Sequence, residues 1–335
     1  MIMSHVPFID IAPFLHGSAA DRQRVARQVD EACREVGFFM IGGHGVPERL
    51  MEDTRAAFKA FFDQPADYKR RFGKTEDFNS PGFVEVGDAA LSYTRGAVAP
   101  PDLNEIFQVT PVDVGDSPYF TAPQARQFFP TNRFPDVPAD FSDLAVEYYR
   151  AVYGLARSAL SIAAVALRLP EDYFEGRVDK AMATLVVRDY PEQKVVPLPG
   201  QLRAGAHTDF GTLTLLLAED RPGGLEVMSK RGTWEPVVAP HNCYIVNLGD
   251  MMARWTNDKW VSTLHRVANP PRDASGVTRR TSLVFFTNPN YDTLIECLPT
   301  CMAENGTPKY PPVLAGDYYL GKMRQMRKKV AEPAA

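Results

Sequence analysis

The chain has 335 residues, of which 45% are hydrophobic and 23% are charged, a balance that is typical of a folded globular protein. This composition excludes wholesale disorder, collagen-like repeats and coiled-coil arrays. The net charge is −4, from 37 lysines and arginines and 41 aspartates and glutamates, so the chain lacks the strongly basic character of nucleic-acid-binding proteins.

The N-terminal part of the chain alternates predicted strands and helices. Residues 6–11 alternate as a short strand, and residues 21–36 carry apolar side chains at the spacing of an amphipathic helix. Residues 38–41 form an apolar run that predicts a buried strand, and a glycine-rich turn follows it. Pro47 then opens a further predicted helix, which extends to about Phe62.

The middle of the chain contains a weakly periodic region and then the longest predicted helix. Residues 64–135 are rich in Pro, Gly, Asp and Arg, and we expect short elements there, with loops of the kind that line pockets. Residues 140–169 have helical periodicity throughout. The apolar stripe of this helix comprises Phe141, Leu144, Tyr148, Val152, Leu155, Ala159 and Ile162.

The second half of the chain is β-rich, because short apolar runs follow one another with Gly, Pro, Asn and Asp between them. This pattern predicts an all-β sandwich or barrel, and a last predicted helix at 316–330 closes the chain. The predicted strands lie within residues 183–190, 211–217, 224–228, 243–249, 263–269 and 281–289.

The sequence predicts neither secretion nor a membrane span. Its first residues lack a cationic region, so we expect no signal peptide. Its most apolar stretch, residues 159–167, is far shorter than the ~20 residues that a membrane span needs. The four cysteines form no CxxC pair, and we expect reduced thiols in a cytoplasmic protein.

The sharpest local pattern of the chain is His207-Thr208-Asp209. Side chains at positions i and i+2 of an extended segment point to the same face, so one imidazole and one carboxylate can reach the same ion. His265, in a later β-like run, offers a third ligand. Two histidines and a carboxylate form the facial triad of non-heme Fe(II) oxygenases. Zinc accepts the same ligands, so the triad alone does not decide the metal.

Arg280 and Ser282 supply a second signal, because they also stand at i and i+2 on a predicted strand. A guanidinium and a hydroxyl on one face form a fork for a carboxylate, and each charge-assisted hydrogen bond contributes about 1.5–3 kcal/mol. An oxygenase that binds a 2-oxo dicarboxylate needs such a fork beside its metal, whereas a zinc hydrolase has no evident need for it. The fork therefore favours the oxygenase.

Together, these residues resemble the HxD…H…RxS pattern of the isopenicillin N synthase-like family of Fe(II)/2-oxoglutarate-dependent oxygenases. The resemblance covers nearly the whole chain. Further stretches that are similar to the family are VPFIDI, GFFMIGGHGVP, DLNE at 102–105, residues 132–135, GGLEV, residues 247–270 and YPPVLAGDYY.

The resemblance implies a mainly β fold with flanking helices, built on a double-stranded β-helix (jelly-roll) core. We expect residues 1–135 to form a helical and loop-rich region packed on the core. Residues 136–335 would form the oxygenase core with the long helix and the C-terminal helix, and both parts would act as one catalytic unit.

The resemblance also implies the roles of the site residues. His207, Asp209 and His265 match the positions that bind Fe(II) in the family. Arg280 and Ser282 match those that hold the distal carboxylate of 2-oxoglutarate. Tyr190, which precedes a proline in RDYPEQ, matches a position that often assists at that carboxylate.

The implied activity is an oxygenase that uses Fe(II), O2 and 2-oxoglutarate to hydroxylate, desaturate or cyclise a small organic substrate, while 2-oxoglutarate is decarboxylated to succinate. An isopenicillin N synthase-like oxidase that does not use 2-oxoglutarate is an alternative, because the fork can bind a substrate carboxylate instead. A zinc hydrolase or a non-catalytic metal-binding barrel is a further alternative. We expect no nucleic-acid or membrane partner, and a monomer.

The sequence departs from the family pattern in two places. The step from His265 to Arg280 is longer than is usual, which predicts a longer hairpin before an intact strand. Arg188 stands two residues before Tyr190, where many plant members carry asparagine. We expect Arg95 or Arg188 to meet a carboxylate of the substrate.

Overall fold

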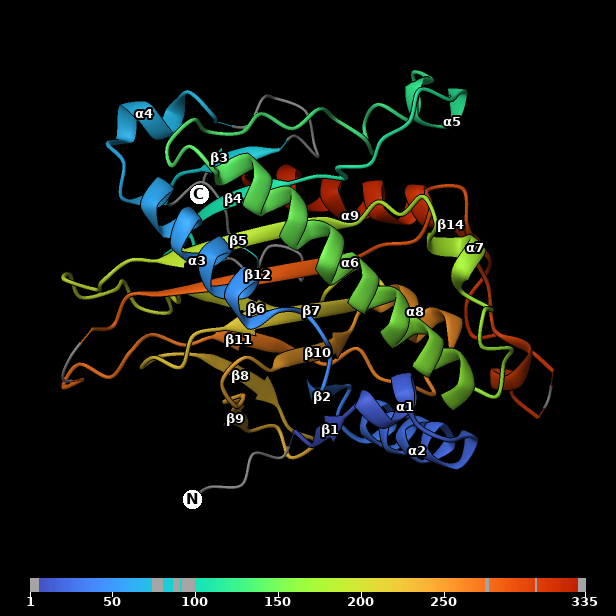
Figure 1. The fold of residues 1–335 in the computed structure, drawn as a ribbon. Coiled ribbons are helices and arrows are strands. Elements are labelled where there is room, and N and C mark those ends of the chain that lie inside the picture. The colour runs from blue at the N-terminus through green and yellow to red at the C-terminus, as the bar shows by residue number, and fades with distance from the viewer. Residues whose placement is uncertain are drawn as a thin grey trace.

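The computed structural model arranges the chain as two main β-sheets and a small two-stranded ribbon, with helices packed around them (Figure 1). Among the described residues, no helix combines the length and the apolar character that a membrane crossing requires. Side chains are described as far as residue 325. The structure describes residues 6–73, 81–86, 91, 100–274, 277–304 and 306–330.

Helices occupy both ends of the described chain and its middle. They are α1 (Ala12–His16), α2 (Ala19–Glu35), α3 (Glu48–Phe62), α4 (Ala66–Arg70), α5 (Pro118–Thr121), α6 (Phe141–Ala166), α7 (Glu175–Val178), α8 (Asp250–Trp255) and α9 (Ala315–Val330), with a 3-10 turn at Pro299–Cys301. The helix expected at 21–36 begins earlier, at Ala19. Ser18, the residue before the helix, forms a reciprocal capping box with Asp21 in its first turn.

Strands dominate the second half of the described chain, and some also come from the first half. They are β1 (Phe8–Asp10), β2 (Phe38–Gly42), β3 (Gly82–Val84), β4 (Glu105–Val109), β5 (Thr184–Tyr190), β6 (Ala204–His207), β7 (Leu213–Ala218), β8 (Leu225–Met228), β9 (Trp234–Pro236), β10 (Tyr244–Leu248), β11 (His265–Val267), β12 (Arg280–Thr287), β13 (Leu294–Ile295) and β14 (Val313–Leu314).

The described strands form an eight-stranded sheet, a four-stranded sheet and a two-stranded ribbon. The large sheet has the order β1-β2-β10-β7-β12-β5-β4-β3, and the small sheet has the order β6-β11-β8-β9. Strands β1 to β4, from the first half of the chain, thus continue the same large sheet as the strands of the second half. The region expected to be mostly loops, residues 64–135, contributes β3 and β4 to its edge.

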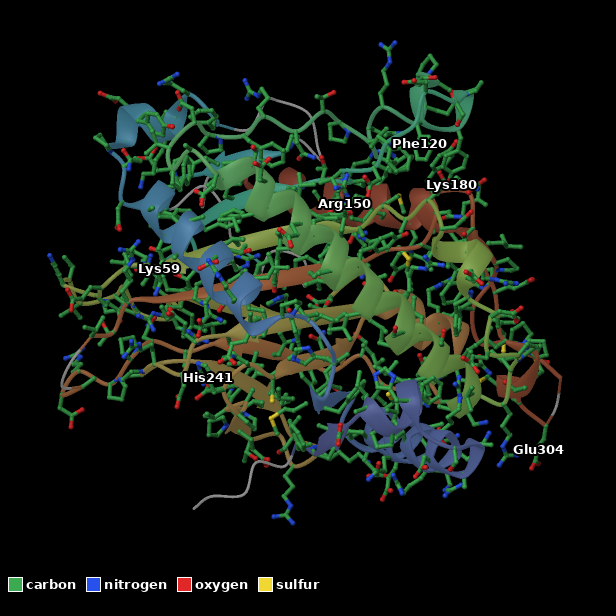
Figure 2. All side chains as sticks on the ribbon, in the orientation of Figure 1. Lys59, Phe120, Arg150, Lys180, His241 and Glu304 are labelled. Atoms are coloured by element: carbon green, nitrogen blue, oxygen red, sulfur yellow. The ribbon has the colours of Figure 1, made fainter. Side chains whose placement is uncertain are left out.

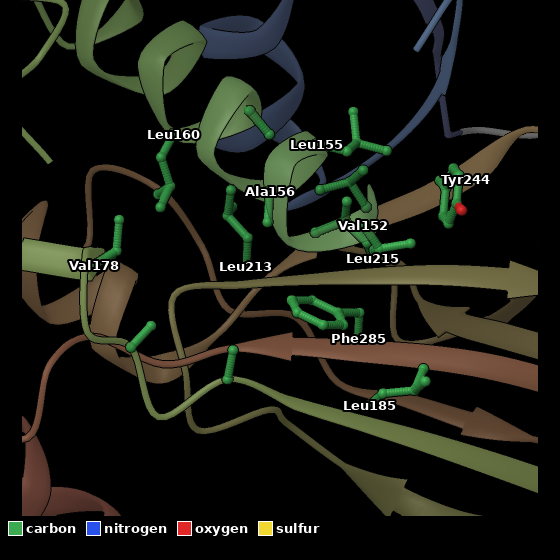
Figure 3. Packing of buried hydrophobic residues seen from close by; sticks show 14 of the residues in the cluster. Val152, Leu155, Ala156, Leu160, Val178, Leu185, Leu213, Leu215, Tyr244 and Phe285 are labelled. Atoms are coloured by element: carbon green, nitrogen blue, oxygen red, sulfur yellow. The ribbon is translucent and has the colours of Figure 1, made fainter. Parts of the chain in front are cut away.

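The outer face of the large sheet is covered by helices. The long helix α6 lies across this face, with α3 beside it (Figure 1). Figure 3 shows Val152 and Leu155 of α6 above Leu215 of β7 and Phe285 of β12, all of which belong to the main hydrophobic core. Arg150 is exposed on the opposite side of α6 (Figure 2). It forms an ion pair with Asp113. The helix is therefore amphipathic, as its sequence predicted.

The inner face of the large sheet meets the small sheet. A second apolar cluster joins Phe38 of β2 and Ile245 of β10 to Leu225 and Val227 of β8. Because side chains alternate along a strand, odd-numbered residues of β5, β7 and β12 enter the helix-covered core, and even-numbered residues face the small sheet. This alternation decides which side chains of the large sheet can reach the candidate site.

Candidate active site

Strands β6 and β11 bring His207 and His265 together. The two strands are antiparallel neighbours, and the two histidines are direct partners in their register. Their ring centroids lie 4.3 Å apart. Asp209 Oδ1 lies 3.7 Å from Nε2 of each histidine. The three buried side chains thus place one ligand atom each within 4.8 Å of one another, as a metal site requires.

Backbone carbonyls fix the orientation of both imidazole rings. The Nδ1 atom of His207 lies 2.7 Å from the carbonyl oxygen of Gly205, and Nδ1 of His265 lies 3.0 Å from that of Thr263. A carbonyl oxygen only accepts, so each Nδ1 carries the hydrogen and donates it. Each Nε2 then keeps a free lone pair toward Asp209 Oδ1, which is the tautomer that a metal ligand needs.

Two side chains of the large sheet hold the carboxylate of Asp209. Its Oδ2 accepts a hydrogen bond of 2.6 Å from Thr214 Oγ1 in β7 and another of 2.6 Å from Asn247 Nδ2 in β10. The Oδ1 atom is left to face the two histidines. Sequence reasoning missed both supporting residues, although Asn247 carries a signal, because it is the polar residue of the otherwise apolar strand β10.

The turn after Asp209 is fixed by the start of α8. The backbone amide of Asp250 donates to the carbonyl of Asp209 at 2.7 Å, and that of Met251 donates to the carbonyl of Phe210 at 3.1 Å. This close approach requires glycine before the helix, because a Cβ atom at Gly249 would lie 2.3 Å from the carbonyl oxygen of Gly211. Helix α8 therefore sets the backbone position of the carboxylate ligand.

Burial and mutual charge set the protonation of the cluster. Burial, followed by the electrostatic effect of the neighbouring His265 imidazole, lowers the pKa of His207 to about 3. Burial alone would raise the pKa of Asp209, but the two histidines and the hydrogen bonds to its Oδ2 outweigh that effect and lower it. At neutral pH the site accordingly offers a neutral imidazole at His207 and a carboxylate at Asp209.

Arg280, Tyr190, Ser282 and Arg188 share the inner face of the large sheet. Arg280 pairs in register with Tyr190, and Ser282 pairs with Arg188, on the adjacent strands β12 and β5. All four residues are even-numbered members of these strands, so they point away from the helix-covered core. The sheet therefore brings together the predicted fork and the predicted tyrosine.

The guanidinium of Arg280 is buried without a bound carboxylate among the described residues. It donates to the carbonyl oxygens of Gly223 at 3.1 Å and Glu219 at 3.2 Å, while its buried Nε atom has no hydrogen-bond partner. Its Cζ atom lies 5.6 Å from the ring centroid of Tyr190. Burial lowers the pKa of Arg280. A buried cation with spare donor capacity is suited to a carboxylate ligand.

The donor chemistry fits both groups that the sequence implied. Two imidazole nitrogens and one carboxylate oxygen, with their remaining polar atoms already bonded, suit a Fe(II) ion with open positions. The buried guanidinium of Arg280 suits the far carboxylate of 2-oxoglutarate. Arg95, the other arginine expected near the substrate, lies outside the described residues.

Known protein families match both halves of the chain. Residues 6–136 match the family described as non-haem dioxygenase in morphine synthesis N-terminal. Residues 181–289 match the 2OG-Fe(II) oxygenase superfamily, where 2OG is 2-oxoglutarate.

Curated relatives match over almost the whole chain. The chain is 34% identical over 324 residues to the 2-oxoglutarate-Fe(II) type oxidoreductase hxnY of Emericella nidulans, a match that covers 95% of this chain and 89% of that protein. It is 32% identical over 325 residues to the validamycin A dioxygenase of Streptomyces hygroscopicus subsp. limoneus, which covers 96% of this chain and 86% of that protein.

Solved structures share the fold. A 2OG-Fe(II) oxygenase family protein from Caulobacter crescentus superposes with a TM-score of 0.82 at 27% identity, covering 96% of this chain and 99% of that one. A full-length Neurospora crassa protein, solved in complex with alpha-KG and thymine, gives a TM-score of 0.81 at 26% identity, covering 97% of each chain. The predicted jelly-roll core with flanking helices is confirmed by this agreement.

The fold and the relatives define the class of this protein as non-heme Fe(II) oxygenases, and the chain belongs to the 2OG-Fe(II) oxygenase superfamily. It is an enzyme that uses Fe(II), 2-oxoglutarate and O2 to oxidise a small organic substrate. The predicted family, cofactors and class of reaction are thereby confirmed.

Proposed function

We propose that His207, Asp209 and His265 bind the Fe(II) ion of this oxygenase, through Nε2, Oδ1 and Nε2. One observation carries the proposal: these atoms converge within 4.8 Å, while the other polar atom of each side chain is already hydrogen-bonded. A ligand set prepared in this way has little freedom to lose when the metal binds.

Arg280 and Ser282 would bind the distal carboxylate of 2-oxoglutarate, and Tyr190 would line the same end of the site. The support is their common inner face and the unpartnered Nε atom of the buried Arg280. A carboxylate there would neutralise a guanidinium whose hydrogen bonds now go to neutral carbonyls.

Bound Fe(II), O2 and 2-oxoglutarate would supply the oxidising power for the substrate, with succinate and CO2 as the products of 2-oxoglutarate. The chain's own residues orient the participants. Thr214 and Asn247 hold Asp209, and the carbonyls of Gly205 and Thr263 hold the imidazole rings. The three proposed ligands are buried, which limits the access of water to them. Hydroxylation, desaturation and ring closure all fit this arrangement.

Succinate formation tests the proposed roles. Anaerobically purified protein is mixed with Fe(II) and 2-oxoglutarate, exposed to O2 and assayed alone and with a panel of small carboxylic acids, amino acids and phenolics. We expect succinate that depends on all three components and falls sharply in Arg280→Gln, but not in Arg279→Gln. Equal succinate from Arg280→Gln and wild type would overturn the role of Arg280. Iron-loaded protein that forms no succinate would favour the oxidase that does not use 2-oxoglutarate.

We also propose that the protein is a cytoplasmic monomer without a nucleic-acid partner. The support is that Cys33, Cys243, Cys297 and Cys301 are all free thiols and that the net charge is −4. Size-exclusion chromatography with light scattering should give a mass near 37.3 kDa. A mass twice as large would contradict the monomer.

A further inference from the structure

Arg188 is a buried cation on the inner face of the large sheet that the proposed iron and 2-oxoglutarate contacts leave unused. It pairs in register with Ser282, and only 9% of its surface is exposed. A guanidinium keeps its charge at any pH that a protein tolerates. A full positive charge therefore lies between the sheets, on the face that carries the proposed cosubstrate fork.

Arg188 has no direct ion pair among the described residues, and the nearby Asp102 carboxylate acts on its charge only from a distance. Its Nη1 donates to Asn104 Oδ1 at 3.0 Å, and this neutral amide is the hydrogen-bond partner that the described part of the chain gives it. Among the described residues, no carboxylate oxygen lies within the 4.0 Å of an ion pair with Arg188. The oxygens of the nearby Asp102 accept from the backbone amides of Gly205 and Leu91 instead.

Asn104 holds the guanidinium on the side of the iron ligands. The Nδ2 atom of Asn104 donates to the carbonyl oxygen of Arg203 at 2.7 Å, immediately before β6. The neighbouring amide of Leu103 donates to the carbonyl of Leu202 at 3.0 Å, so this segment runs along β6. Strand β6 ends at His207. Arg188 thus extends from the large sheet toward the strand that carries an iron ligand, and its position is fixed before any ligand arrives.

We propose that Arg188 binds a carboxylate of the primary substrate and so directs that substrate to the iron. The inference rests on the proposed function, because the iron position defines where the oxidised carbon must lie. A guanidinium forms two parallel hydrogen bonds with a carboxylate, which fixes orientation as well as position. In the proposed function, the two carboxylates of 2-oxoglutarate would be held at the iron and at Arg280. A third anion-binding group therefore serves the other reactant.

The unpaired state of Arg188 supports a role in binding over a role in folding. A buried charge without a direct ion pair destabilises the folded state unless a ligand neutralises it. Arg279, on the opposite face of the sheet, shows how an arginine with a structural role is neutralised, because it forms ion pairs with Asp189 and Asp63. Replacing Arg188 with a neutral residue of similar length should therefore not lower the melting temperature of the ligand-free protein.

Acetate and acetamide provide a test that does not need the identity of the substrate. They have nearly the same shape, and only acetate is charged. The protein is loaded with Fe(II) and 2-oxoglutarate under argon, where no turnover occurs, and its melting temperature is followed during titration at constant ionic strength. We expect acetate to raise the melting temperature of the wild type more than acetamide does. In Arg188→Gln, the apparent dissociation constant for acetate should rise at least tenfold.

Two further variants and one further measurement complete the test. Arg188→Lys keeps the charge and should retain the preference for acetate, although more weakly, and it serves if Arg188→Gln does not fold. Arg279→Gln removes a paired arginine and should leave the preference intact. Binding of 2-oxoglutarate to Arg188→Gln, measured by calorimetry, should stay within about twofold of the wild-type affinity, which corresponds to less than 0.5 kcal/mol.

Several outcomes would overturn the proposal. They are equal protection of the wild type by acetate and acetamide, undiminished acetate binding in Arg188→Gln, and a tenfold loss of 2-oxoglutarate affinity in Arg188→Gln, which would assign Arg188 to the cosubstrate instead. Failure of the proposed function would give a different result. In that case, 2-oxoglutarate would not raise the melting temperature of the iron-loaded wild type, or Arg280→Gln would bind 2-oxoglutarate with the wild-type affinity.

Discussion

Arg279 and Arg280 are neighbours in sequence, yet their side chains leave opposite faces of the large sheet. Arg279 forms ion pairs with Asp189 at 3.1 Å and Asp63 at 2.5 Å. Arg280 donates to the carbonyl oxygens of Gly223 and Glu219 and has a buried Nε atom without a partner. Strand alternation thus places one arginine in a structural network and leaves the other available for a ligand.

The first prediction uses this contrast. Arg280→Gln should raise the KM for 2-oxoglutarate by about two orders of magnitude, since two charge-assisted hydrogen bonds of about 1.5 kcal/mol or more are lost. Arg279→Gln should leave this KM unchanged and lower the melting temperature, because it breaks two ion pairs. Initial rates of succinate formation measure the first quantity. An unchanged KM in Arg280→Gln would contradict the proposed fork.

The second prediction concerns the support of Asp209. Thr214→Val removes the hydroxyl that donates to Asp209 Oδ2 at 2.6 Å, and it should weaken Fe(II) binding about 10–100-fold. Thr212→Val is the matched control, because its buried hydroxyl donates to the carbonyl of Thr287 and not to Asp209. Anaerobic titration with Fe(II) compares the variants. If both lose the same iron affinity, the effect is one of general packing.

The third prediction is a pH dependence of the metal-free protein. Burial, followed by the electrostatic effect of the neighbouring His265 imidazole, lowers the pKa of His207 from 6.5 to about 3 in the folded state. The unfolded chain takes up a proton near pH 6.5, whereas the folded state does not do so until about pH 3. The stability that the neutral His207 contributes to the folded state is therefore complete above pH 6.5. It is lost as the pH falls, by at most about 1.4 kcal/mol per pH unit.

Melting temperatures of chelator-treated wild type and His207→Gln at pH 7.5 and 5.5 test this dependence. The wild type should lose more stability than the variant over this interval, because only the wild type carries the titrating imidazole at position 207. Parallel losses in the two proteins would show that His207 has an ordinary pKa.

The fourth prediction concerns the turn that positions Asp209. Gly249→Ala would place a Cβ atom 2.3 Å from the carbonyl oxygen of Gly211, and we expect a loss of about 1–3 kcal/mol together with weaker iron binding. Gly154→Ala, in α6, meets no atom within 4 Å and should stabilise the protein by about 0.5–1 kcal/mol. Chemical denaturation of both variants measures these changes. If Gly249→Ala left the free energy of unfolding and the iron affinity unchanged, the close contact between α8 and the turn would not be needed to position Asp209.

Local patterns were sufficient to predict much of the fold. The helix expected at 140–169 is observed as Phe141–Ala166, because its apolar stripe repeats at helical spacing over many turns. The strand expected at 281–289 is observed as Arg280–Thr287. The spacing of His207 and Asp209 placed two candidate ligands on one side of the chain, and the register of β6 and β11 brings His265 to them.

The remaining features depend on contacts between distant segments, which no local pattern encodes. Strand β4 is short and lies in a region rich in loop-forming residues, so its pairing with β3 and β5 defines it. Thr214 and Asn247 contact Asp209 only after β7 and β10 have paired. Asn104 lies in the DLNE stretch that is similar to the family, but its contact with Arg188 joins the residue before β4 to the neighbouring strand β5 and could not be inferred from spacing.

The proposed iron site is tested most directly by the metal content of Asp209→Asn. This substitution keeps the shape of the side chain and its neighbours Thr214 and Asn247, but it removes the charge that faces the two histidines. After anaerobic loading with Fe(II) and desalting, the wild type should retain about one iron per chain, and Asp209→Asn should retain almost none. Equal iron retention in the two proteins would contradict the assignment of His207, Asp209 and His265 as the iron ligands.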